Sequence, residues 1–145
     1  MDNLSKFSER LKELMIERNI KSNELGVAIG VDGSNIRRWL RGVNSVALNQ
    51  LVKLAIYFNC PVDFLVGRIE YYERFKPKTC PVFIENLYKI LEEKGVSTYK
   101  LNNDTSIKYG LLTRWRKGTV PHLTSLLELA NYLDCSIDYL IGLES

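Results

Sequence analysis

The chain has 145 residues, 46% of them hydrophobic and 26% charged, which is typical of a globular protein. No apolar run approaches the ~20 residues of a membrane helix, and the opening MDNLSKFSER has no apolar core of a secretory signal, so we expect a cytoplasmic protein without membrane contact. The net charge of +3 is too small to indicate a polyanionic partner for the chain as a whole, which makes local charge clusters more informative.

The first predicted helix covers about residues 5–18, because its apolar residues follow the i, i+4, i+7, i+8 rhythm of one buried face. These residues are Phe7, Leu11, Leu14 and Met15. A short second helix is predicted from about Ser22 to Ile29. Ser22 is expected to cap its free backbone N–H groups, and Gly30 is expected to end it.

A third helix is predicted from about Gly33 to Arg41, with Asp32 as its cap and Gly42 as its end. A fourth helix covers about residues 48–58, and a short fifth helix follows Pro61. On the third helix one stripe is apolar (Ile36, Trp39, Leu40), and another is polar (Ser34, Arg37, Arg38, Arg41). Such a helix suits the DNA major groove, since arginine reads guanine with two hydrogen bonds or holds phosphate.

The second half of the chain repeats the first. An offset of 76 residues aligns Phe7 with Phe83 and Trp39 with Trp115, and after the loss of one residue an offset of 75 aligns Cys60 with Cys135. Because the matches are mainly apolar or helix-ending residues, the repeat is first of all a repeated core. Further helices are predicted near residues 81–94, 98–105, 109–117, 123–133 and 136–141, with Pro81 in a first helical turn.

The sequence therefore predicts an all-α protein with two tandem five-helix domains joined by a short linker. The expected boundaries are residues 1–70, 71–80 and 81–145. The first domain has ten basic and eight acidic side chains, whereas the second has seven and eight. In the second domain the helix near 109–117 carries apolar Leu111, Leu112 and Trp115 amid polar and basic residues without an acidic one: Lys108, Thr113, Arg114, Arg116 and Lys117.

No metal, cofactor or catalytic site is expected. Cys60, Cys80 and Cys135 are an odd number without CxxC spacing, and Cys60 and Cys135 are expected to be buried thiols. His122 is the only histidine, and the sequence places no nucleophile or carboxylate to act with it. We therefore do not expect an enzyme.

The second and third helices with their tight turn form a helix-turn-helix, in which the later helix reads the groove. The runs ELGVAIGVDGSNIRRWLRG and LNQLVKLAIYFNCPVDFLVG resemble the phage-repressor and Cro-type family, also called the xenobiotic-response-element family of regulators. The shared pattern consists of Leu25–Gly26, Gly30–Val31, Ile36, Trp39, Gly42, Leu54–Ala55 and Val62–Asp63–Phe64–Leu65. The resemblance covers nearly the whole chain, twice, and implies two lambda-repressor-like DNA-binding domains.

The resemblance also implies roles for single residues of the first domain. Ser22 stands where the family touches phosphate, and Arg41 stands where the chain leaving the third helix does so. Positions that usually meet base edges hold Gly33, Ser34 and Arg38, with Asn35 and Arg37 alongside. Gly33 departs from the usual polar residue, so one base contact is expected to be lost, and Leu40 replaces a frequent glutamate.

The second domain departs further from the family pattern. Asn102 replaces the small residue, Ser106 replaces the turn glycine, and Tyr109, Gly110 and Leu111 occupy the base-reading positions. Residues that still suit phosphate are Thr98, Arg114, Arg116 and Lys117. The second domain is therefore expected either to bind DNA weakly and without sequence preference or to contact a protein.

Together these features predict a sequence-specific transcriptional regulator of double-stranded DNA. Most proteins that it resembles are repressors, and dimers of single-domain relatives place their reading helices ~34 Å apart. The sequence leaves open whether the tandem domains imitate such a dimer or the chain forms a homodimer. The competing interpretation is an antitoxin-like interaction module, in which the second domain binds a partner protein and DNA contact is secondary.

Overall fold

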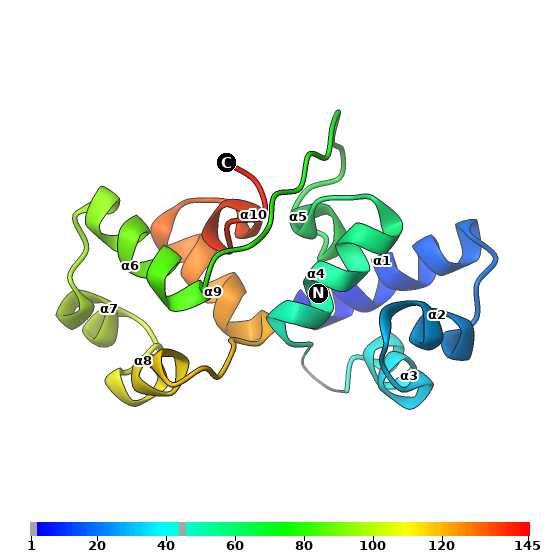
Figure 1. The fold of residues 1–145 in the computed structure, drawn as a ribbon, viewed down its shortest axis with the longest axis horizontal. Helices are drawn as coiled ribbons and strands as arrows, with labels where there is room; N and C mark the ends of the chain where they lie inside the picture. Colours follow the sequence, from blue (N-terminus) through cyan, green and yellow to red (C-terminus); the bar gives the residue numbers. More distant parts are fainter. Residues whose placement is uncertain (1–2, 44–45) are drawn as a thin grey trace. The chain divides into compact units, whose positions relative to one another are not determined.

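The computed structural model describes residues 3–43 and 46–145, and the regular structure in this part of the chain is entirely α-helical (Figure 1). It forms two compact units, residues 1–75 and 76–145. No helix within the described ranges is long and apolar enough to cross a membrane. The same ranges hold no group of three His, Cys, Asp or Glu side chains that could bind a metal ion.

The first unit contains five helices: α1 (Asn3–Glu17), α2 (Ser22–Ile29), α3 (Gly33–Arg41), α4 (Leu48–Phe58) and α5 (Val62–Leu65). Asp32 caps α3 as predicted, because its carboxylate accepts a hydrogen bond of 2.8 Å from the backbone N–H of Ser34. Gly30 and Gly42 end α2 and α3 with φ of 77° and 71°, a left-handed conformation that glycine adopts without steric cost.

The prediction that Ser22 caps α2 was wrong. The capping position belongs to Lys21, and Ser22 is the first helical residue. The carboxylate of Glu24 reaches back and accepts a hydrogen bond of 3.2 Å from the backbone N–H of Lys21. The side chain that accepts a backbone hydrogen bond at the start of α2 is therefore the Glu24 carboxylate, three residues after the capping position, and not the Ser22 hydroxyl.

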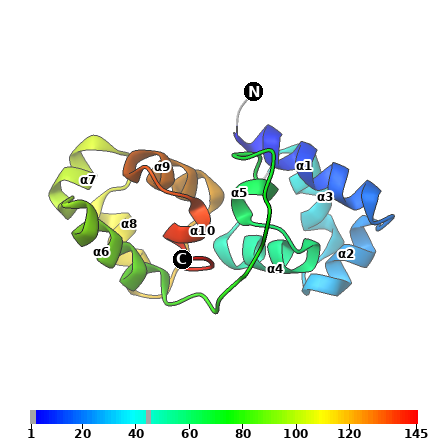
Figure 2. The same ribbon diagram turned by 90° about the horizontal axis from the view of Figure 1, so that it is seen from above.

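Aromatic packing forms the centre of the first unit. Trp39 is 2% exposed, and its ring centroid lies 6.4 Å from that of Phe7 on α1. Helix α1 packs against α3, and α2 packs against both α3 and α4 (Figure 2). Ile36 and Leu25 are fully buried in the same core, so the apolar stripe predicted for α3 is its inner face.

The second unit contains α6 (Phe83–Lys94), α7 (Thr98–Asp104), α8 (Tyr109–Arg116), α9 (Leu123–Leu133) and α10 (Ile137–Leu140). Its core repeats the aromatic pair, with the rings of Trp115 and Phe83 edge to face at 5.3 Å. The prediction that Pro81 lies in the first turn of α6 was wrong, since that helix starts at Phe83. Pro81 instead lies against Gly142, where a Cβ atom would collide with the proline ring.

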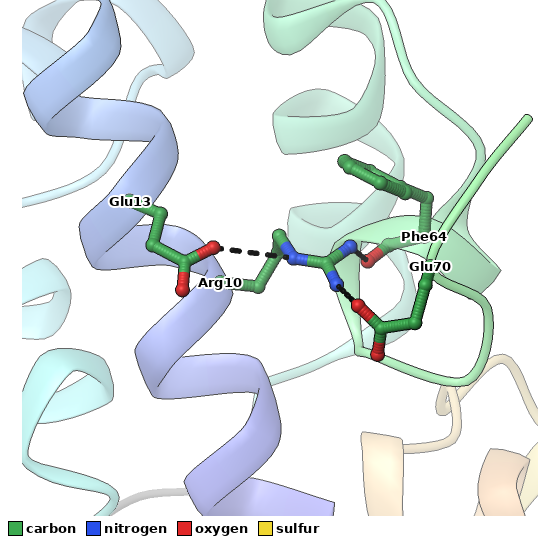
Figure 3. Close-up of polar contacts among 4 residues, drawn as sticks. All are labelled: Arg10, Glu13, Phe64 and Glu70. Atoms are coloured by element: carbon green, nitrogen blue, oxygen red, sulfur yellow. Dashed lines mark hydrogen bonds and ion pairs between the residues drawn. The ribbon is translucent and has the colours of Figure 1, made fainter.

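Each unit joins its first helix to its last by a side chain at the same position of the repeat. In the first unit Arg10 donates hydrogen bonds to the carbonyl oxygen of Phe64 (2.5 Å) and to a carboxylate oxygen of Glu70 (2.8 Å), and Glu13 lies 3.7 Å away (Figure 3). Arg10 is only 8% exposed, so these partners offset the cost of burying its charge. In the second unit Asn86 donates to the carbonyl oxygen of Leu140 at 2.7 Å.

Residues 71–80, which the sequence predicts to be a linker, are partly docked on the units. The Tyr72 hydroxyl donates a hydrogen bond of 3.0 Å to the carbonyl oxygen of Asn59. The backbone N–H of Lys78 donates a hydrogen bond of 2.7 Å to the carbonyl oxygen of Leu143. The expectation of two buried thiols holds for Cys60, whereas Cys135 is half-buried.

The Trp39→Ala variant is expected to unfold the first unit, because truncation of a buried tryptophan costs about 3–5 kcal/mol and a small domain has little stability to spare. Hydrogen exchange of the full-length chain, resolved by peptide, would show fast exchange in α1–α5 and protection retained in α6–α10. The matched variant Trp115→Ala should give the reverse pattern. Protection of α3 in the Trp39→Ala protein would contradict the packing described above.

Candidate nucleic-acid interface

Helices α2 and α3 approach each other closely because glycines stand at their contact. A Cβ atom on Gly26 would lie 2.5 Å from the carbonyl oxygen of Val31, a distance that real Cβ atoms do not adopt. A Cβ atom on Gly33 would overlap the side-chain oxygen of Asn23 and lie 3.2 Å from its Cα. A larger residue at position 26 would therefore meet the backbone of the turn, whereas one at position 33 would chiefly displace the Asn23 side chain.

The outward face of α3 is basic. Arg37, Arg38 and Arg41 are exposed, whereas Ile36 and Trp39 on the opposite side are buried. The remaining residues assigned to DNA contact are half-buried: Ser22 at the start of α2, and Gly33, Ser34 and Asn35 in the first turn of α3. The predicted DNA-binding residues of the first unit thus lie at the N-termini of α2 and α3 and along the exposed face of α3.

The arginines of this face have neutral partners. Arg37 donates to the side-chain oxygen of Asn23 at 3.0 Å, and Arg38 donates to that of Asn35 at 3.3 Å. In the part of the chain that the structure describes, no ion pair joins Arg37, Arg38 or Arg41 to a carboxylate. Carboxylates of the described residues therefore do not neutralise these three charges through ion pairs.

The carboxylate that caps α3, Asp32, lies near this basic face. Hydrogen bonding from Ser34, with a smaller effect from nearby Arg37 and Arg38, lowers the pKa of the Asp32 carboxyl below its ordinary value. A lowered pKa keeps this carboxylate charged, and so keeps the cap bond intact, as the pH falls toward the acidic range. The start of the basic helix is thus held in place without drawing an arginine away from the surface.

The second unit builds its helix-turn-helix differently. Because Ser106 stands in place of Gly30, the left-handed turn is absent, α7 ends one residue earlier than α2, and Thr105 is extended at φ −132°. Asn102 stands in place of Gly26, and its side-chain oxygen accepts a hydrogen bond of 2.9 Å from the backbone N–H of Tyr109. The residue that breaks the family pattern therefore caps α8 from across the turn.

A carboxylate also fixes this turn. Glu128 on α9 accepts a hydrogen bond of 2.9 Å from the backbone N–H of Ser106 and another from its hydroxyl. The matching residue of the first unit is Lys53, whose ammonium lies 4.0 Å from the position of a Cβ on Gly30. The two units therefore carry opposite charges beside their turns. The contact between Glu128 and Ser106 joins residues 22 positions apart, and the sequence analysis did not predict it.

The predicted site residues of the second unit are more often engaged within the unit. Lys108 donates to the carbonyl oxygen of Asn102, and Thr113 donates to that of Tyr109. Arg116 donates to the Tyr88 hydroxyl and to Thr113. The exposed members of the predicted set are Thr98, Lys108, Tyr109, Arg114, Arg116 and Lys117. This surface is basic, but several of its donors are already used.

Comparison with known families agrees with the repeat. The model of the Cro/C1-type HTH DNA-binding domain matches residues 10–69 and, separately, residues 86–145. Each match includes one helix-turn-helix and the two helices that follow it. No curated protein sequence matches the chain.

The Gly26→Ala variant should destabilise the first unit by about 1–3 kcal/mol, the usual cost of overpacking, because the new methyl group meets backbone rather than a flexible side chain. Gly110→Ala in α8 is the matched control. A Cβ there meets no atom within 4 Å, and alanine favours helix, so no loss is expected. Denaturant unfolding would compare the two variants, and an equal effect of both would refute the proposed tight contact.

Proposed function

Because the chain belongs to the family of Cro/C1-type HTH DNA-binding domains, in two tandem copies, we propose that it is a sequence-specific transcriptional regulator that acts as a repressor. The resemblance predicted from the sequence is thereby confirmed at the level of the family. The single observation that carries the finer proposal is the face of α3, where three exposed guanidinium groups lie opposite a buried tryptophan. We propose that this face enters the major groove of double-stranded DNA.

In this proposal affinity and sequence preference come from different contacts. Arg41 and Ser22 bind phosphates, and release of counterions from the duplex supplies much of the affinity. Arg38 and Ser34 meet base edges, with Asn35 and Arg37 beside them, and supply the preference. Gly33 makes no base contact of its own.

We propose that the second unit adds phosphate contacts without reading sequence. Arg114 and Lys117 are exposed on and just after α8, and Thr98 begins α7. Lys108, Tyr109, Thr113 and Arg116 border the same surface, and their bonds within the unit limit them to supporting contacts. A tethered second contact of this kind would raise the affinity of the first unit by increasing its local concentration at the DNA.

A second candidate function for this unit is the binding of a protein partner, as in an antitoxin-like module. It is favoured by two exposed aromatic rings, Tyr99 at 66% and Tyr109 at 47%, on the surface where a DNA-reading helix would be polar. Tyrosine is enriched at protein interfaces because its ring is apolar and its hydroxyl forms hydrogen bonds. In that case removal of the basic residues of α8 would leave DNA binding unchanged.

Site selection from random DNA by the full-length protein tests the central proposal. Recovery of a defined sequence supports it, and recovery of no preferred sequence would refute it. A palindromic site would indicate that two chains pair on DNA, because the symmetry of a site mirrors that of the protein. Two unlike boxes would indicate that one chain uses both units.

The Arg38→Ala variant should weaken binding to the selected site by about 1–3 kcal/mol and relax the preference at one base pair. The matched variant Arg41→Ala should weaken binding to all sequences alike, because a phosphate contact carries no sequence information. Fluorescence anisotropy with the selected site and its single-base variants measures both effects. A uniform loss in Arg38→Ala would reassign this residue to phosphate.

The double variant Arg114→Ala/Lys117→Ala tests the role of the second unit. If these residues bind phosphate, the slope of log K against log salt should decrease in magnitude by about 1 for each lost contact, with base preference unchanged. Glu92→Ala on α6 controls for a general change of surface charge. An unaltered salt slope in the double variant would favour the protein-partner function of this unit.

A further inference from the structure

Asn23, on the side of α2 that meets α3, has a role that the family resemblance does not supply. We propose that Asn23 is a positioning residue: it orients the guanidinium group of Arg37 for base recognition and adds a hydrogen-bond donor beside it. This inference rests on the proposed function, because it needs α3 to face DNA. It concerns one residue pair and leaves the contacts of Arg38 and Arg41 aside.

The contact between the two side chains joins separate helices. The side-chain oxygen of Asn23 on α2 accepts a hydrogen bond of 3.0 Å from Nη1 of Arg37 on α3, over 14 residues of sequence. By contrast, the 3.3 Å bond from Arg38 to Asn35 lies within one turn of α3. An exposed arginine has many rotamers, and fixing it before binding removes part of the entropy that association would otherwise cost.

The absence of a side chain at Gly33 leaves room for the Asn23 side chain beside the start of α3. A Cβ on residue 33 would overlap the Asn23 side-chain oxygen and approach its Cα to 3.2 Å. The glycine that interrupts the family pattern therefore has a structural reason. The polar contact missing from position 33 is replaced by the pair formed by Asn23 and Arg37.

The pair presents donors to its surroundings. The side-chain oxygen of Asn23 accepts from Arg37, so the side chain can still donate through its amide nitrogen. The guanidinium group of Arg37 can likewise donate through the N–H groups that do not contact Asn23. Such a surface matches acceptors in the major groove, above all O6 and N7 of guanine, and phosphate oxygens at its edge. Since Asn23 is neutral, it orients Arg37 without cancelling the charge that attracts DNA.

The second unit serves as an internal comparison. The positions of Asn23, Gly33 and Arg37 hold Tyr99, Tyr109 and Thr113 there. The Thr113 hydroxyl donates to the carbonyl oxygen of Tyr109 in its own helix. The pair is thus a feature of the first unit, the unit to which we assign sequence preference.

A double-mutant cycle in the full-length protein tests the proposal. Binding to the selected DNA site and to its single-base variants would be measured for wild type, Asn23→Ala, Arg37→Ala and the double variant. Asn23→Ala should reduce the preference at the base pair read by Arg37 by roughly two- to tenfold, the effect of freeing one immobilised side chain. In the Arg37→Ala background the same substitution should leave that preference unchanged, because the two residues act as one.

Asn23→Asp separates orientation from charge. Its carboxylate still accepts from Arg37, so the base preference should be retained, while added negative charge and the lost donor should weaken binding to all sequences. Tyr99→Ala, at the matching position of the second unit, should not change the preference. Thermal unfolding of each variant would show that the first unit stays folded.

The outcomes separate this inference from the proposed function. Independent effects of Asn23→Ala and Arg37→Ala on base preference would overturn the positioning role, as would loss of preference in a folded Asn23→Asp protein. Loss of preference in Arg38→Ala alone, with Arg37→Ala silent, would also overturn it but leave the proposed function standing. Absence of any preferred sequence for the wild-type protein would remove both.

Discussion

The burial of Trp39 against Phe7 determines what the surface of the first unit can do. An indole at 2% exposure fixes the rotation of α3 about its own axis, so the residues on the opposite side must face solvent. Those residues are Arg37, Arg38 and Arg41. The second unit repeats the aromatic pair as Trp115 and Phe83, so the same rotation is imposed on α8. Packing in the core thus sets the orientation of each candidate reading helix.

The distance between the helices of each helix-turn-helix depends on a smaller set of positions. Gly26 and Gly33 allow α3 to approach α2 closely, and Gly30 turns the chain between the two helices with a left-handed backbone. In the second unit Asn102, Ser106 and Tyr109 occupy these positions. There the side-chain oxygens of Asn102 and Glu128 accept hydrogen bonds from the backbone N–H groups of Tyr109 and Ser106 and hold the turn. The fold therefore forms without these glycines, with the polar side chains of Asn102 and Glu128 holding the turn in their place.

Much of the fold could be predicted from the sequence, because apolar periodicity and helix-ending glycines act locally. The cap at Asp32 and the inward side of α3 were predicted for this reason. The cap at Lys21 was not, since it depends on which of two neighbouring residues carries the extended backbone. The contacts from Asn23 to Arg37 and from Glu128 to Ser106 join different helices, and no pattern within one helix indicates them. The contact between Asn23 and Arg37 had one signal in the sequence, namely glycine at position 33 where the family usually has a polar residue.

A comparison of the two units shows which features follow from the fold and which need another explanation. Both units keep the aromatic core and the link from the first helix to the last, although Arg10 and Asn86 make that link with different chemistry. These shared features belong to the repeated core of the fold. The neutral partners of Arg37 and Arg38 are present in the first unit only, and the core does not require them. The second unit also exposes basic side chains on α8, and Arg116 has neutral partners there in the hydroxyl groups of Tyr88 and Thr113. The two units therefore differ in how single arginines are held and not in whether the helix face is basic.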